Sequence, residues 1–342
     1  MEKVLSIKKE RDSNFELCRL VCMLYIVVYH LIIHVPAVYE NTSWGLPLRN
    51  ICHIGVVVFV MISGYYGIRR KWRRLLELAL TVSFYNFLGI LVATLCFNQN
   101  FEIKSLLSVF FPVTKGGYWF ITTYVVLYLI APYINMVLEK LQRRDFALLL
   151  IVLGIIVWYG GGIWNIGIGH GRGIMAFILS YSIGSYMRKY YNTRTRSFSY
   201  WGGQYLVASV IMVAGIALLP GILSKAFSHF TFGYNELGLY IMSILFLLMF
   251  SRIKIKSSII NWCATACLGI YLCHENANIG SLIVYPLYSH LLWDNIHNQW
   301  LILLAHIIFA FIVVIFCVLI DKVRQSMFFF IERKKDPTLC SS

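Results

Sequence analysis

The chain alternates between long apolar runs and short polar segments that are rich in lysine and arginine. Most of the apolar runs approach the roughly 20 residues that a helix needs to cross the hydrocarbon core of a membrane. An even number of crossings leaves both ends of a chain on the same side. The pattern predicts ten spans, at residues 17–36, 51–68, 76–97, 118–138, 146–160, 171–187, 200–220, 237–251, 258–275 and 299–320.

The distribution of basic residues supports this topology. Of the 30 Lys and Arg residues, 24 lie in segments on the N-terminal side of the predicted spans and five lie in the opposite loops. Cytoplasmic loops carry such an excess, so both termini are predicted to be cytoplasmic. The same residues account for the net charge of +15, because they orient helices and face anionic membrane lipids. No single basic face remains for nucleic acid, which we exclude as a partner.

Composition agrees with an integral membrane protein. The 342 residues are 59% hydrophobic and 13% charged, well away from the balance of soluble domains. The predicted fold is therefore an all-α polytopic membrane protein. We expect a single membrane domain over residues 1–322 and a basic cytoplasmic tail over residues 323–342. Nine cysteines without a CxxC spacing predict neither a disulfide framework nor a cysteine metal site. Nothing in the pattern indicates an oligomeric state.

The first span carries a seam of ionisable side chains. At 100° per residue, Arg19 and His30 share one helix face and lie roughly 16 Å apart, with Glu16 and His34 near the same stripe. Ionisable groups inside a span usually face a cavity or a partner. The simpler interpretations are that Arg19 snorkels to the lipid headgroups and that His30 packs between helices. His30 and His34 have no acidic or cysteine third ligand nearby in sequence, so no metal is predicted.

Four further segments follow in order, and each sits at the end of a predicted span. They are VFVMISGYYG at 58–67, RRKWRR at 69–74, GYWFITTY at 117–124 and GIYLCHE at 269–275. Together with the Arg19-to-His30 spacing, this series resembles the integral-membrane acyltransferase-3 family over about residues 11–322. It is most similar to the members that modify bacterial capsules and other cell-surface polysaccharides.

The resemblance implies transfer of an acyl group, usually acetyl, from cytoplasmic acetyl-CoA to a hydroxyl. The acceptor would be a cell-surface glycan or its lipid-linked precursor, and the protein would lie in the bacterial cytoplasmic membrane. His30 is then the expected general base, with a transient acyl-histidine as the alternative. Arg19 is expected to place the donor. The basic cluster is expected to hold the CoA phosphates, unless it serves topology alone, and comprises Arg69, Arg70, Arg73 and Arg74.

The other candidates have plain structural alternatives. Glu275 either orients an imidazole, binds acceptor hydroxyls or lies at a solvated helix end. Substrate contacts are expected from Ser63, Trp119, Tyr124 and His274. Ser63 can equally serve close helix packing, and the two aromatic residues can belong to an interfacial belt.

A second function class stays open. A carrier that exports polysaccharide or lipid-linked sugar without acyl chemistry also has about ten spans and intramembrane charges. The pairing of His30 with a basic entrance large enough for CoA is the feature that distinguishes the enzyme from the carrier. Two outer segments complete the expectations: the apolar run SLIVYPLYSHLLW within the connection 276–298 as a re-entrant or interfacial helix, and the glycine-rich stretch 167–173 as a flexible hinge or lid.

Overall fold

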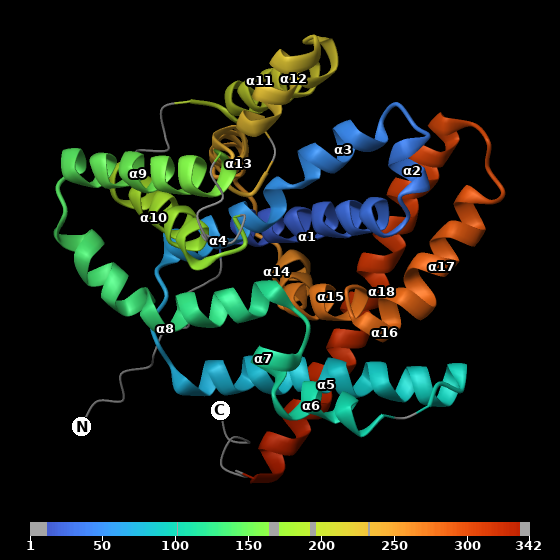
Figure 1. Ribbon diagram of the computed structural model, residues 1–342. Helices are drawn as coiled ribbons and strands as arrows, with labels where there is room; N and C mark the ends of the chain where they lie inside the picture. The colour runs from blue at the N-terminus through green and yellow to red at the C-terminus, as the bar shows by residue number, and fades with distance from the viewer. Residues whose placement is uncertain (1–11, 101, 164–170, 192–195, 232, 336–342) are drawn as a thin grey trace, which may run out of the picture.

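The protein is a bundle of tilted helices, and no strand occurs in the part of the chain that is described (Figure 1). The structure is a computed structural model that describes residues 12–100, 102–163, 171–191, 196–231 and 233–335. Most of the glycine-rich stretch 167–173 lies outside these residues. The longer helices are α1 (Ser13–His34), α4 (Ile54–Tyr66), α5 (Trp72–Phe97), α8 (Trp119–Lys140), α9 (Arg143–Val157), α10 (Ile174–Tyr190), α11 (Phe198–Leu218), α12 (Gly221–Thr231), α13 (Leu237–Phe250) and α18 (Gln299–Lys335).

Shorter helical segments connect and cap the long ones. They are α2 (Ala37–Glu40), α3 (Gly45–Cys52), η1 (Ile103–Ser105), α6 (Leu106–Phe110), α7 (Pro112–Lys115), η2 (Trp158–Ile163), α14 (Ser258–Ala264), α15 (Cys267–His274), α16 (Ala277–Ile279), η4 (Gly280–Val284), α17 (Tyr285–Tyr288) and η5 (Ser289–Trp293). The segment expected to be re-entrant or interfacial is therefore helical over residues 277–293.

Each of the ten predicted spans coincides with helix. Among the residues that the structure describes, seven helices are long and apolar enough to cross a membrane: Ser13–His34, Gly45–Tyr66, Trp72–Phe97, Trp119–Lys140, Arg143–Gly161, Phe198–Leu218 and Gln299–Phe329. The other three predicted spans correspond to α10, to α13 and to the broken pair α14–α15. The protein is thus an all-α polytopic membrane protein, and the number of ten crossings stays a prediction.

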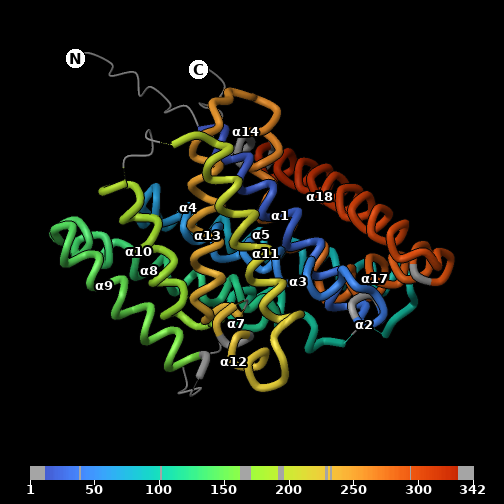
Figure 2. Tube along the Cα trace, turned by 90° about the horizontal axis from the view of Figure 1, so that it is seen from above, coloured from blue at the N-terminus to red at the C-terminus, as the bar shows by residue number. Residues whose placement is uncertain are grey.

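The ends of the chain's described part lie together. The start of α1 and the last turns of α18 are at the same end of the bundle (Figure 2). This arrangement is the one that an even number of crossings requires. Helix α18 runs without a break through residue 322, where we expected the membrane domain to end. The eight cysteines in the described ranges are free thiols, as the absence of a CxxC spacing predicts.

Helix α1 lies at the centre of the packing. It contacts α3, α4, α13, α14, α15 and α18, and its side chains enter both large apolar cores. One core joins α1 to α5, α15 and α18, and the other joins it to α4, α10 and α13. A polar residue on α1 is therefore enclosed on most sides, which suits a buried site.

Local breaks in the helices follow the sequence. Pro132 lies inside α8, where it removes a backbone hydrogen bond, and α8 bends along its length (Figure 1). Gly67 ends α4 with a φ of 74°, a conformation that favours glycine, and lets the chain turn into the basic cluster at 69–74. Between α14 and α15 the helix is interrupted at Thr265 and Ala266.

Two glycines set the closest helix crossing. At Gly64 of α4 an added Cβ would overlap the backbone carbonyl of Tyr181, and at Gly184 of α10 it would overlap that of Met61. Small residues let backbones approach closely, and close packing is the main source of helix association in a bilayer. The Ser63-Gly64 and Ser182-Ile-Gly184 pieces of the sequence thus hold α4 against α10.

We predict that Gly64→Ala destabilises the protein by about 1–3 kcal/mol, because the methyl group meets backbone that cannot move aside. Thermal unfolding in detergent measures the effect. Gly203→Ala in α11 is the matched control, since an added Cβ there meets open space. Equal melting temperatures for the two variants would contradict the packing described.

Candidate functional site

Two segments far apart in sequence bring three of the candidate residues together. His30 lies on α1, His274 is the last residue of α15, and Glu275 follows it. The Nδ1 atom of His30 lies 2.9 Å from Nε2 of His274 and 3.2 Å from Oε2 of Glu275. Both histidines are buried. The break before α15 and the end of α15 therefore place this pair against the last turns of the first helix.

The hydrogen bonds fix the positions of the protons. Nδ1 of His274 lies 2.6 Å from the carbonyl oxygen of Ile270, which can only accept, so Nδ1 carries the proton. Nε2 of a neutral His274 is then an acceptor, and the proton between the two rings belongs to Nδ1 of His30. A neutral His30 consequently has an unprotonated Nε2.

Glu275 gathers donors from three side chains. It accepts from His34 Nε2 at 3.3 Å and from the Tyr285 hydroxyl at 2.7 Å, besides its contact with His30. The ring of His34 stacks on that of Tyr285, with centroids 4.1 Å apart. These contacts hold the carboxylate against His30. Of the three roles expected for Glu275, this position fits the one of orienting an imidazole. We call these five residues the His–Glu cluster: His30, His34, His274, Glu275 and Tyr285.

The same atoms have the chemistry of metal ligands. Ligand atoms of His30, His274 and Glu275 all lie within 4.8 Å of one another, and imidazole and carboxylate are ligands that zinc takes. The sequence near His30 offers no acidic ligand, and the structure brings one, Glu275, from the end of α15. The proton assignment accounts for the His30–His274 contact as a hydrogen bond, and the carboxylate lies within ion-pair distance of His30, so our prediction stays a site without metal.

His30 faces a central cavity of about 200 Å³. Its walls are largely apolar and include Trp119, Phe120, Tyr124 and Tyr271. No hydrogen bond of His30 Nε2 is found within the described ranges, whereas Nδ1 has two partners. The nitrogen that can take a proton is therefore the one left for a molecule in the cavity.

A larger vestibule adjoins this cavity on the side of the bundle where α1 begins. It consists of two adjoining pockets of about 610 and 550 Å³ that share Arg19, Ser63, Arg74 and Tyr124. Tyr124 also lines the central cavity, and its hydroxyl lies 3.3 Å from that of Ser63. Ser63 and Tyr124 therefore stand where the vestibule meets the cavity.

The cationic side chains expected to bind the donor divide into two groups. Arg19, Arg69 and Arg74 line the vestibule. Arg70 instead stacks on Trp72 and Tyr133, with its guanidinium carbon 5.6 and 5.8 Å from the ring centroids. Arg73 pairs with Glu77 at 3.2 Å on an exposed face. Neither Arg70 nor Arg73 lines the vestibule, the cavity or the outer pocket described next.

An outer pocket of about 370 Å³ lies on the other side of the cavity wall, beside α3 and the end of α12. It is lined by Arg49 and Asn50 among others, and shares Tyr29 and His53 with the central cavity. The rings of Tyr29 and His53 stack at 4.8 Å. This ring pair is the partition between the outer pocket and the cavity that His30 faces.

The family model that describes an acyltransferase domain, that of acyltransferase-3, matches residues 12–322, most of the chain. The chain belongs to the acyltransferase-3 family. No curated protein and no solved structure matches it. Membership makes the chain a membrane acyltransferase, as the motif series predicts.

Several residues of this acyltransferase-3 site are not apparent in the sequence. Tyr285 lies in an apolar outer segment, and the ring pair of Tyr29 and His53 joins α1 to the residue before α4. Trp119 has a guanidinium partner, Arg172, whose central carbon is 5.5 Å from the ring centroid. Tyr285 gave no signal in the sequence, because it lies within an apolar run of the chain.

We predict that Glu275→Gln lowers the acyl-transfer rate by about a hundredfold or more, because an amide does not stabilise the charge that His30 gains on accepting a proton. Initial rates in isolated membranes, corrected for protein amount, measure this effect. Glu102→Gln in an exposed outer loop is the matched control. A rate within twofold of the control would remove Glu275 from the site.

Proposed function

We propose that the protein is an O-acetyltransferase of the bacterial cytoplasmic membrane. It moves an acetyl group from cytoplasmic acetyl-CoA to a hydroxyl of a cell-surface polysaccharide or of its lipid-linked precursor. The observation that carries the proposal is the unprotonated Nε2 of His30 at a cavity that joins a cation-lined vestibule. A base for a hydroxyl and a site for an anionic donor thus share one passage.

The vestibule suits the donor. Guanidinium groups bind phosphate through charge and paired hydrogen bonds, and Arg19, Arg69 and Arg74 line this space. Arg19 is itself positioned by Glu16 at 2.7 Å and by the ring of Tyr66. With the nucleotide in the vestibule, the pantetheine arm extends past Ser63 and Tyr124 and brings the thioester to the central cavity. A cavity of about 200 Å³ favours a short acyl group such as acetyl.

The chemistry needs one base and no cofactor beyond the donor. As the acceptor oxygen attacks the thioester carbonyl carbon, Nε2 of His30 takes the hydroxyl proton. The imidazolium that forms is stabilised by Glu275 at Nδ1. The carbon–sulfur bond then breaks, and the departing sulfur receives the proton from Nε2. The products are the acetyl ester and CoA, and His30 returns to its starting state.

The acceptor approaches from the opposite side. The outer pocket offers polar groups for sugar hydroxyls, among them Arg49 and Asn50, and it ends at the Tyr29–His53 ring pair. Movement of that pair would admit a single hydroxyl to the cavity. Donor and acceptor then meet at His30 without sharing an entrance.

We predict that His30→Ala abolishes acetylation of the surface glycan, because His30 is the cavity residue whose Nδ1 contacts Glu275, a support that His53 on the cavity wall does not share. NMR of glycan purified from the native strain maps the O-acetyl groups. His290→Ala is the control, since that side chain is highly exposed.

Unchanged acetylation, with the variant present in the membrane at the wild-type amount, would exclude the enzyme mechanism. Loss of the glycan itself from the cell surface in the variant would instead favour the exporter without acyl chemistry.

We also predict that Arg69→Gln with Arg74→Gln weakens acetyl-CoA binding by more than tenfold, at about 1–2 kcal/mol for each lost phosphate contact. The matched double variant, Arg70→Gln with Arg73→Gln, removes the same charge from side chains outside the vestibule and should weaken binding less. Equilibrium binding to purified protein measures both. Equal weakening would return the basic cluster to a role in topology.

A further inference from the structure

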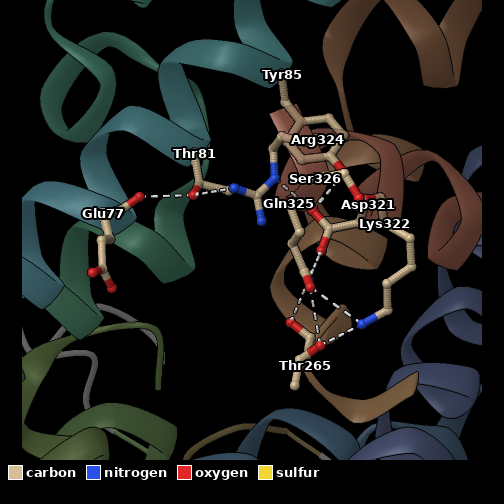
Figure 3. A network of polar contacts seen from close by, with 9 residues as sticks. All are labelled: Glu77, Thr81, Tyr85, Thr265, Asp321, Lys322, Arg324, Gln325 and Ser326. Carbon is tan, nitrogen blue, oxygen red and sulfur yellow. Dashed lines mark hydrogen bonds and ion pairs between the residues drawn. The ribbon is translucent and has the colours of Figure 1, made fainter. Parts of the chain in front are cut away.

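Asp321, a buried acid on α18, supports Arg324. The sequence alone places Arg324 among the basic residues that orient helices in the membrane. Asp321 of α18 is fully buried. Its Oδ1 accepts from the Tyr85 hydroxyl at 3.0 Å and from Arg324 Nε at 2.7 Å, and its Oδ2 accepts from Gln325 at 2.6 Å (Figure 3). A buried charge is costly unless it is paired and hydrogen-bonded, so this arrangement fixes Arg324.

Arg324 is held on three sides. Besides Asp321, its Nη1 donates to Thr81 Oγ1 at 3.1 Å, and its central carbon lies 5.1 Å from the centroid of the Phe328 ring. The side chain is about nine-tenths buried. Its remaining nitrogen, Nη2, has no hydrogen bond within the described ranges, and Figure 3 shows it without a partner. A charge that only orients a helix would be expected to lie in solvent.

Arg324 faces the vestibule. It lines the larger pocket together with Arg19, Arg69 and Arg74. The acids that line the vestibule are occupied: Glu77 pairs with Arg73, Glu16 pairs with Arg19, and Asp12 accepts from Tyr66. The vestibule therefore has an excess of positive charge, and Arg324 is the buried one of these four arginines.

We propose that Arg324, positioned by Asp321, binds a phosphate group of the acyl-CoA donor through Nη2. This inference rests on the proposed function. Arg324 lies two residues beyond the stretch that the family model matches, so the match does not assign it a role. Arg69 and Arg74 are exposed, whereas Arg324 is held by its partners before the donor arrives and loses little side-chain freedom on binding.

The test compares two donors on purified full-length protein: acetyl-CoA, and S-acetylpantetheine, which has the same thioester and no phosphate. Arg324→Gln should raise KM for acetyl-CoA by about tenfold to a hundredfold and leave KM for S-acetylpantetheine unchanged. Arg324→Lys, which keeps the charge beside Asp321 but not the guanidinium fork, should give an intermediate increase for acetyl-CoA alone. Arg144→Gln, exposed at the start of α9, is the control.

The outcomes separate the two proposals. If wild-type protein transfers acetyl from acetyl-CoA but Arg324→Gln changes KM for both donors equally, or changes only kcat, Arg324 is a structural residue and this inference fails alone. If wild-type protein neither binds nor uses acetyl-CoA, the proposed function fails. Should Arg324→Gln not fold, Arg324→Lys carries the test, and equal KM values for wild type and lysine variant with acetyl-CoA would overturn the inference.

Discussion

The carboxylate of Glu275 is the group around which the site is organised. A carboxylate among membrane helices is costly to leave without partners, and this one takes hydrogen bonds or ion pairs from His30, His34 and Tyr285. Those residues come from α1 and α17, so the same contacts that satisfy the charge also hold the two elements against the end of α15. The same contacts therefore orient His30 and hold these helices together.

Helix α15 links this cluster to the donor side. Gly269, near its start, has no room for a Cβ because the carboxyl group of Asp321 occupies that space, and His274 at its end contacts His30. The two positions are five residues apart, or roughly 7.5 Å along a helix. In our proposal, the residue that holds the donor phosphate and the residue that takes the proton are thus supported by opposite ends of one short, buried helix.

The sequence predicts the architecture well because the bilayer imposes simple rules. Apolar length and the distribution of Lys and Arg locate every helical segment that corresponds to a span. The seam on α1 is predictable too, because Arg19 and His30 share a face at helical spacing. Contacts such as Asp321 with Tyr85, 236 residues apart, have no local signature. From the sequence alone, Arg324 therefore looks like a charge that orients a helix in the membrane. Which residues of the basic cluster line the vestibule depends on the directions of their side chains, and the spacing of the residues does not give these directions.

The site joins helix α1 to residues much further along the chain. His30 and His274 are 244 residues apart, and Tyr285 comes later still. During synthesis α1 enters the membrane with its seam of ionisable groups long before their partners exist. A nascent chain that stops before α15 contains His30 but not the ring of His274 that sets its tautomer. In our proposal, such a chain is inactive however well its first helices fold.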